Sequence, residues 1–297
     1  LMEGFAFLTS RVQMKMDAEF PRFSQRLLEM IAPNYLAPTP SMAIAEIEPD
    51  SSRGDLSKGF IVPRGTMMDS LALKKTGVTC SYTTAHEVNL LPLKIDKVEL
   101  GGVPADLPLA QLGLSQRGIN SALRIRIACD GPQNLGHLDF DRLEFFLGGP
   151  DIEALKLLEL VMEHHAGIVC QTVSKQPQRQ LLSSDALRQE GFDADQALLP
   201  DDLRNFDGYR LLQEYFAFPA RFRFISLSGL GKLIQRCEDE KAFDIFILLD
   251  KSDDQLERVV DASHLALHCT PVINLFPKVA ARQKLSESQH EYHLVVD

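Results

Sequence analysis

Apolar residues recur at helical spacing from the start of the chain. They lie three or four residues apart, the spacing of one helix face. The first set is Phe5, Leu8, Val12 and Met16. Pro21 interrupts the pattern, and proline is tolerated at the first position of a helix but not in its interior. The pattern therefore predicts one helix to about Glu19 and a second helix from about Pro21.

The second helix has an apolar face of its own, and prolines then end helical structure. The face consists of Phe23, Leu27, Leu28 and Ile31, and the prolines are Pro33, Pro38 and Pro40. Beyond residue 40 the apolar period changes to two, which is typical of strands. These changes predict three regions: a helical arm at 1–40, a β-rich module at 41–148 and a mixed α/β module at 149–297.

The β-rich module contains six predicted strands. Their ranges are 42–47, 59–62, 78–84, 90–100, 123–127 and 141–147, with a polar connection at 101–119. Leu123–Ile127 alternates cleanly between apolar and charged residues, as in a strand with one buried face. The segment 141–147 is richer in apolar residues and is expected to be covered on both faces.

The mixed module begins with a helix whose start is marked by Pro150 and Asp151 and whose end is marked by Gly167. Further helices are predicted at 207–218, 232–236 and 254–260, and further strands at 168–173, 221–227, 242–249 and 272–276. The segment 174–207 is polar and predicts loops with at most one short helix. Prolines at both ends of 272–276 predict an edge strand or a segment presented at the surface.

The two ends of the chain suggest a fragment of a longer protein. Leu1 is not an initiator residue, and helical periodicity is already running there. His290–Asp297 reads as a strand without a closing turn. The expected fold class is α+β and β-rich, with an N-terminal helical arm followed by β-sheet modules and interspersed helices.

Composition narrows the class of protein. The chain has 297 residues, of which 45% are apolar and 24% charged, which excludes a disordered, collagen-like or small disulfide-rich protein. It carries 31 basic and 41 acidic residues, a formal charge of −10, and no local basic face. Nucleic acid is therefore not an expected partner. No apolar run reaches the roughly 20 residues that cross a bilayer, so membrane insertion is not expected either.

Cysteine usage points to a reducing compartment. The five cysteines are far apart and odd in number, and most of them lie in apolar runs. They are Cys80, Cys129, Cys170, Cys237 and Cys269. Because no Cys-x-x-Cys pair exists, a structural zinc site is not expected. The pattern predicts buried free thiols and a cytosolic protein.

Motifs for catalysis and cofactor binding are missing. Gly229 and Gly231 lack the third glycine of a dinucleotide fingerprint, and no serine lies in a Gly-x-Ser-x-Gly elbow. Adjacent His164 and His165 point about 100° apart on a helix, which suits the end of a helix better than a metal site. His264 and His268 have helical zinc spacing but lack a clear third ligand.

The acidic run from Asp193 to Asp202 lacks the glycine and terminal glutamate of a calcium loop. We therefore predict no catalytic residue, no cofactor and no metal. Catalytic groups that are distant in sequence leave an enzyme with an unrecognised site as an alternative.

An aromatic cluster lies on and just after the helix predicted at 207–218. Its members are Tyr209, Tyr215, Phe216, Phe218, Phe222 and Phe224. On a helix, these residues and neighbouring leucines form two apolar sides, and such a helix is either well buried or contacts a partner. From the residues alone, burial in the core is favoured over an interface.

Six segments, taken in order, resemble the TssF family, also called ImpG or VasA. The segments are Leu1–Val12, Glu19–Pro21, Pro38–Met42, Ile61–Thr66, Tyr209–Pro219 and Cys269–Phe276. The resemblance spans essentially the whole chain. Because TssF proteins are about twice as long, this chain corresponds to roughly the N-terminal half. TssF is a baseplate component of the bacterial type VI secretion system.

The resemblance implies a structural role without catalytic residues. TssF proteins form a wedge of two TssF copies and one TssG, which also joins TssE and TssK trimers. Six wedges surround a spike hub at the cytoplasmic side of the envelope. The family is similar to wedge proteins of contractile phage baseplates, in which N-terminal helices form a bundle between subunits. A generic β-sandwich binding module is the remaining alternative.

These considerations give a set of candidate interface residues. They are Phe5, Leu8, Val12, Met16, Tyr209, Tyr215 and Phe216. We expect the first four to pack into an inter-subunit helix bundle, with packing on the chain's own β-rich body as the alternative. The resemblance does not settle whether the aromatic segment is core or interface.

Overall fold

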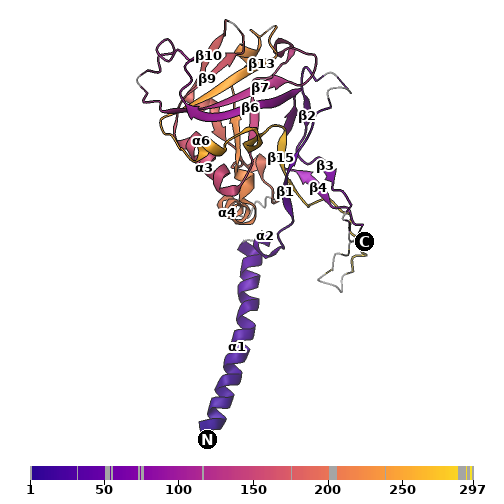
Figure 1. The fold of residues 1–297 in the computed structure, drawn as a ribbon. Coiled ribbons are helices and arrows are strands. Elements are labelled where there is room, and N and C mark those ends of the chain that lie inside the picture. Colours follow the sequence, from indigo (N-terminus) through magenta and orange to yellow (C-terminus); the bar gives the residue numbers. More distant parts are fainter. Residues whose placement is uncertain are drawn as a thin grey trace.

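A long helix projects from a β-rich body (Figure 1). The computed structural model describes residues 2–31, 33–50, 54, 56–72, 74, 77–115, 117–174, 176–200, 206–237, 239–286, 292 and 295. Helix α1 (Met2–Ile31) forms the projecting rod, and the short helix α2 (Pro33–Leu36) follows at its base. Helix α4 (Asp207–Ala217) lies beside α2, where the rod meets the body. The arm predicted at the start of the chain is thus helical and stands apart from the body.

Helix α1 is continuous, so the predicted division at Pro21 is wrong. All 30 residues form one helix with Pro21 inside it, and none of them is buried. An interior proline removes one backbone hydrogen bond. On so exposed a helix, the carbonyl that loses its partner is solvated by water, which lowers the cost of the break. The hydroxyl of Ser24 also donates to the carbonyl of Phe20 at 2.9 Å, across the proline.

The body is built on a five-stranded sheet in the order β10-β9-β13-β7-β6. In that order the strands are β10 (Arg179–Leu182), β9 (His165–Thr172), β13 (Ala242–Leu249), β7 (Ser121–Cys129) and β6 (Leu93–Gly102). Strand β7 alternates buried and half-buried residues, as its sequence predicts. Strand β13 lies in the middle and is buried from Phe243 to Leu249. Its apolar run Ile245–Leu249 suits a strand covered on both faces, and the buried Asp244 is paired with Arg124 and Arg126.

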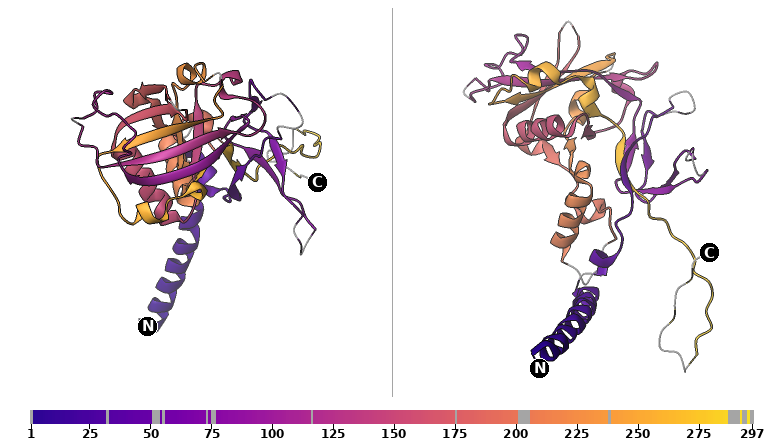
Figure 2. Two further views of the ribbon diagram at one scale, coloured as in Figure 1. Left: turned by 45° about the horizontal axis from the view of Figure 1, so that its top comes forward. Right: turned by 60° about the horizontal axis from the view of Figure 1, so that its bottom comes forward.

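A second sheet, ordered β11-β12-β8-β14, packs with helix α3 against one face of the central sheet. Its strands are β11 (Leu187–Gln189), β12 (Phe224–Leu227), β8 (Leu143–Leu147) and β14 (Leu265–Ala266), and α3 spans Asp151–Glu163. The main core joins Ile125 and Ile245 of the central sheet to Phe145 of β8, Ile225 of β12 and Leu157 of α3. Figure 2 shows α3 beneath the curved central sheet.

The remaining strands form two smaller sheets. One has the order β1-β15-β4-β3 and the other pairs β2 with β5. The strands are β1 (Met42–Glu46), β15 (Cys269–Ile273), β4 (Ser81–Thr84), β3 (Met67–Asp69), β2 (Phe60–Val62) and β5 (Val88–Leu90). Helices α5 (Gly231–Ile234) and α6 (Leu256–Val259) are short. The 3₁₀ turns are η1 (Leu135–His137), η2 (Ser184–Ala186), η3 (Ala194–Gln196), η4 (Pro219–Phe222) and η5 (Ala262–His264).

Strand β15 corrects the prediction of an edge strand at 272–276. It starts earlier, contains Pro271, is buried throughout and lies between β1 and β4. Pro271 pairs with Ile44 of β1, and its carbonyl accepts the N–H of Ala85 at 2.8 Å. In an antiparallel ladder the N–H and C=O groups of one residue point to the same side. The donor that proline lacks therefore faces the end of β4, and no bond to β1 is lost.

Other boundaries moved for local reasons. The strand predicted at 90–100 is two strands, because Leu91 and Pro92 separate β5 from β6. The segment 174–207, predicted as loops, contributes β10 and β11, and the segment predicted as a strand from Arg221 begins with the turn η4. The strand predicted at His290–Asp297 lies outside the described residues except for Tyr292 and Val295, which have no regular structure.

Strands from both predicted modules share the same sheets. Strand β13 pairs with β7 on one side and β9 on the other, and β1 pairs with β15. All pairs between described strands are antiparallel. The fold is therefore a mixed α+β fold with a long N-terminal helix and several antiparallel sheets. The division at residue 148 stays a prediction, and it runs between strands that are paired.

Candidate partner interface

Helix α4 places its charged residues inward and its apolar residues outward. Arg210 and Glu214, one helical turn apart, are buried against the body. The outward side carries four large residues that solvent reaches, with 81% of Phe216 and 52% of Tyr215 exposed. These residues are Tyr209, Leu212, Tyr215 and Phe216. The arrangement is the reverse of an ordinary surface helix and is typical of a helix that a partner covers.

A buried ion pair fixes the inward side of α4. The carboxylate of Glu214 contacts the guanidinium of Arg221, and both side chains are fully buried. Glu214 Oε1 also accepts the backbone N–H groups of Leu198 and Leu199 at 3.2 and 2.9 Å. Arg210 Nη1 lies 3.4 Å from the same oxygen. Since a buried carboxylate is costly unless it is paired and hydrogen-bonded, these contacts set the rotation of α4 about its axis.

Arg221 ties the same helix to a neighbouring loop. Its Nη2 donates to the carbonyl of Gly191, and it lies 3.3 Å from that of Gln196. Its guanidinium also lies 4.6 Å from the ring centroid of Phe222. Burial, together with the positive charges of Arg210 and Arg64, lowers the pKa of Arg221 to about 9. The side chain therefore stays charged at neutral pH.

The aromatic cluster predicted from the sequence is divided between the core and the surface. Phe222 and Phe224 are buried, and Phe224 packs on Phe146 with ring centroids 5.0 Å apart. Tyr215 connects the two parts, because its ring contacts buried Phe222 at 5.9 Å and exposed Phe216 at 5.6 Å. The sequence favoured burial of the whole segment in the core. That prediction is wrong for the side chains on the outward face of α4.

An apolar cavity of about 720 Å³ lies between α4 and the base of α1. Its lining residues come from the last turns of α1, from the segment after it and from α4. They are Leu28, Ile31, Tyr35, Thr39, Tyr209, Arg210, Leu212, Gln213, Phe216 and Ala217. The cavity thus brings the predicted residues Tyr209 and Phe216 next to the arm, beside Leu28, Ile31 and Tyr35, which the sequence analysis did not assign to an interface.

The predicted residues of α1 lie away from this cavity. Phe5, Leu8, Val12 and Met16 face solvent, with 62% of Leu8 and 60% of Val12 exposed. They belong to the part of α1 that extends beyond the body (Figure 1). The alternative that they pack on the chain's own β-rich body does not occur in this structure. Their helical spacing continues through Phe23 and Leu27 to Ile31, which links them to the cavity along one helix face.

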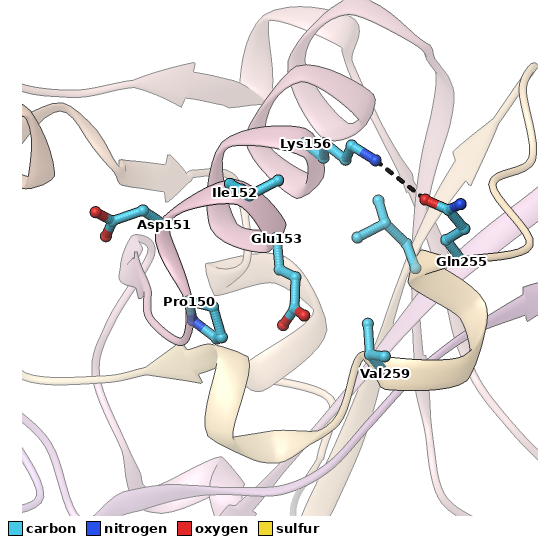
Figure 3. A pocket seen from close by; sticks show the side chains of 8 residues that line it. Pro150, Asp151, Ile152, Glu153, Lys156, Gln255 and Val259 are labelled. Carbon is cyan, nitrogen blue, oxygen red and sulfur yellow. Dashed lines mark hydrogen bonds between the residues drawn. The ribbon is translucent and has the colours of Figure 1, made fainter.

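A second hollow of about 590 Å³ lies between α3 and α6 (Figure 3). The side chains of Lys156 and Gln255 point toward each other, and Lys156 Nζ donates to Gln255 Oε1 at 3.2 Å. Its other lining residues are Pro150, Asp151, Ile152, Glu153, Leu256 and Val259. Glu153 is already paired with His264 at 3.2 Å. Asp151 is paired with Arg223, so each of the three charged residues in the lining has a structural partner.

The histidines have structural partners rather than ligand geometry. His264 lies in η5 between Glu153 and Asp261, and His268 has a left-handed backbone with φ of 56° and accepts the N–H of Leu91. Because His264 and His268 do not lie on one helix, their four-residue spacing does not place them one helical turn apart as a zinc site would need. His164 follows α3 and pairs with Asp250 at 2.9 Å, whereas His165 begins β9. Among the described residues, no group of three potential ligands converges on a metal position.

The cysteines and the acidic loop complete the survey. All five cysteines are free; Cys170, Cys237 and Cys269 are buried, and Cys80 and Cys129 are half-buried. Burial raises the pKa of Cys237 to about 11, so its thiol is unreactive at neutral pH. In the acidic run, Asp193 pairs with Arg188, while Asp201 and Asp202 lie outside the described residues. None of the helices in the described part of the chain combines the length and apolar composition needed to cross a bilayer.

Comparison with known proteins identifies the family. The profile described as "Type VI secretion system, TssF" matches residues 1–297. The chain belongs to the TssF family. It is similar to the type VI secretion system component TssF1 of Pseudomonas aeruginosa, with 41% identity over 300 residues that cover 100% of this chain and 48% of that protein. The chain therefore spans about half the length of this curated TssF relative.

A solved structure agrees with both fold and family. A chain in a cryo-electron microscopy structure of the type VI secretion system TssK-TssF-TssG baseplate subcomplex is similar, with a TM-score of 0.76 and 27% identity. The match covers 98% of this chain and 52% of that chain. Both comparisons thus agree with the family that the six sequence segments resemble, a structural component of the type VI secretion baseplate.

Proposed function

We propose that this chain is the N-terminal half of a wedge subunit of the type VI secretion baseplate. In this role it assembles with a TssG-like protein, a second copy of itself, TssE and TssK-like proteins around the spike hub, on the cytoplasmic side of the envelope. Similarity to wedge proteins of contractile phages belongs to the same proposal. The family match supports the role, and the solved complex of TssF with TssK and TssG supports the TssG-like and TssK-like partners.

The observation that carries the proposal is the projecting helix α1. A 30-residue helix with no buried residue carries Phe5, Leu8, Val12 and Met16 along one exposed face. Leaving such a face in water forfeits about 1.5–3 kcal/mol for each large side chain that a partner could bury. Helices also gain most of their stability in proteins from the packing of an apolar face. We infer that α1 packs into a helix bundle between subunits.

The decisive measurement is the mass of the complex with TssG. The full-length parent protein and this half are each co-expressed with the TssG-like protein of the same secretion gene cluster, and the masses are measured by light scattering. We expect a complex of two parent chains with one TssG. A folded TssG that binds neither form would overturn the proposal. Binding by the parent alone would place the contact in the other half and remove α1 as its main site.

A double substitution tests α1 directly. Changing Leu8→Asp and Val12→Asp places two carboxylates in the apolar face, so we expect the complex with TssG to be lost. Because both positions face solvent, the melting temperature of the chain alone should not change. Gln25→Asp, on the opposite face of α1, is the matched control and should bind as wild type does. Assembly by the double variant at the wild-type level would contradict the role of this face.

A further inference from the structure

We propose that the second half of the full-length protein covers an apolar outer edge of the body, residues 60–69, which contains β2 and β3. The occupant is the part of the same chain beyond residue 297, and it packs apolar side chains on this edge. The inference rests on one element of the proposed function, namely that this chain is the N-terminal half of a longer protein. It does not depend on TssG or on any other partner.

The first support is the exposure of large apolar side chains along the outer edge. Phe60 and Ile61 in β2 and Met67 in β3 are each more than half exposed. Leu71, just beyond β3, is almost fully exposed. Single exposed apolar residues are common on protein surfaces, whereas a row of them marks an interaction surface. The outer edge therefore suits a permanent cover.

The second support is that no described strand lies on the outer side of β2 or β3. Strand β2 pairs only with β5, and β3 ends its sheet. The carbonyl of Thr66 accepts the N–H of Thr84 at 3.0 Å, and the N–H of Ser70 also bonds toward the β4 side. Bonding directions alternate along an antiparallel strand, so the backbone groups of Met67 and Asp69 point away from β4. Such groups are available to another segment of chain.

The edge strand β6 of the central sheet shows the contrast. It carries exposed charges and has a register shift after Ile95, and both features keep an edge from pairing. Its charged residues are Lys94, Asp96, Lys97 and Glu99. The outer edge has only two charged residues, and both are engaged. Arg64 donates to the carbonyl of Ala197 at 2.6 Å, and Asp69 accepts the hydroxyl of Ser81 at 2.7 Å. The outer edge thus lacks the protection that β6 has.

The route of the chain after β15 indicates which segment covers this edge. Asn274 Nδ2 donates to the carbonyl of Ser81 at 2.8 Å, and the carbonyl of Leu275 accepts the hydroxyl of Thr83 at 3.1 Å. Thr83 is the residue of β4 that pairs with Met67 of β3. The chain therefore leaves the body along β4, one strand away from the outer edge (Figures 1 and 2).

The length of the relatives adds to this argument. The chain covers 48% of TssF1 and 52% of the chain in the solved subcomplex, so a segment of similar size belongs to those proteins in addition. A segment tethered one strand away from the outer edge meets it at a high effective concentration. A separate subunit lacks this advantage, which favours the same chain as the occupant.

Photo-crosslinking identifies the occupant. p-Benzoylphenylalanine takes the place of Met67 in the full-length protein, which is purified without TssG and illuminated, and mass spectrometry then identifies the joined peptides. We expect position 67 to be joined to a residue beyond 297 of the same chain. Mixing with an isotope-labelled copy separates contacts within one chain from contacts between two chains. A crosslink to a second copy, or no crosslink at all, would overturn the proposed occupant.

The reactivity of introduced cysteines measures the cover. Met67→Cys and Ile152→Cys are made separately in the full-length protein, because the native side chains are 55% and 72% exposed in this half. Ile152 lies on α3, outside the outer edge, and is the matched control. We expect a maleimide to label position 67 at least about tenfold more slowly than position 152, since the second half has to open first. In urea the two rates should become equal.

Rates within about threefold of each other in the folded protein would overturn the cover. The failure of this inference is distinguishable from that of the proposed function, because both measurements are made without TssG. If wild type binds TssG while position 67 is labelled as fast as position 152, the wedge role stands and the cover is overturned. If wild type does not bind TssG, the wedge role fails, and a crosslink within the chain still supports the cover.

Discussion

Glu214 holds α4 in its orientation, although its buried side chain cannot contact a partner protein. Its carboxylate contacts Arg221, accepts two backbone N–H groups and is fully buried. We expect Glu214→Gln to destabilise the chain by about 3 kcal/mol or more, because Arg221 then keeps a buried charge without its counter-ion. Urea unfolding followed by circular dichroism measures the loss of unfolding free energy.

Glu159→Gln in α3 is the control for this substitution. The exposed Glu159 loses the same charge in the same chemical change, and its variant should stay within about 0.5 kcal/mol of wild type. Equal stability of the two variants would mean that the buried pair does not anchor α4. The outward orientation of the aromatic residues of α4 would then need another explanation.

The buried His268 should make the folded chain less stable in acid. Burial lowers its pKa from 6.5 to about 4. Between these values the unfolded chain binds a proton that the folded chain excludes, so stability is full above pH 6.5 and falls as the pH drops toward 4. Over the whole window the loss amounts to about 3 kcal/mol. Unfolding free energies measured in urea from pH 7 to pH 4 show this slope.

The comparison variant for that slope is His268→Gln. Glutamine can still accept the N–H of Leu91 but does not titrate. Between pH 7 and pH 4 it should lose about 3 kcal/mol less than wild type does, whatever its stability at pH 7. Parallel curves for the two proteins would show that another group causes the acid sensitivity.

At the level of elements, α4 was predicted correctly as a helix but not in its orientation. Its aromatic residues argued for burial because large apolar side chains usually face the core. The burial of Arg210 and Glu214 depends on Arg221 and on the backbone of Leu198 and Leu199, which no helical periodicity reveals. One signal was present: these two charged residues are four apart, and the exposed apolar residues occupy the other side of the helix.

The two classes of aromatic residue in this segment should respond differently to truncation. Tyr215→Ala removes a half-exposed ring and should cost about 1 kcal/mol or less of unfolding free energy. Phe224→Ala removes a buried ring of the core and should cost about 3–5 kcal/mol. Thermal unfolding of both variants measures the difference. A loss for Tyr215→Ala as large as that for Phe224→Ala would show that the outward face of α4 contributes to the core.

Helix α1 shows the limit of a local rule. The sequence predicted helical structure and its apolar face correctly, while Pro21 predicted a break that does not occur. The rule against interior proline is strongest where the freed carbonyl is buried, and here the whole helix is exposed. Whether a helix is exposed depends on how the helices and strands pack together. The sequence around Pro21 therefore could not show that the helix continues through the proline.

For the molecule as a whole, strand existence was more predictable than strand pairing. Strands β7, β8 and β13 follow the predicted ranges closely, because their apolar patterns are local. Their partners are distant in sequence: Met42 of β1 pairs with Ile273 of β15, and Ile125 of β7 pairs with Ile245 of β13. No local pattern shows which strands pair. The predicted division at residue 148 was based on local patterns alone, and strands on either side of it pair with each other.

The shared sheets predict one cooperative body rather than two independent modules. Fragments 1–148 and 149–297, expressed separately, should each lack stable structure, because β7 loses its whole ladder with β13 and β1 loses β15. Co-expressed, they should associate, since the main core contains side chains from both fragments. Circular dichroism and the dispersion of amide resonances in NMR spectra measure folding in each case. A well-dispersed spectrum from either fragment alone would instead support the division into modules at residue 148.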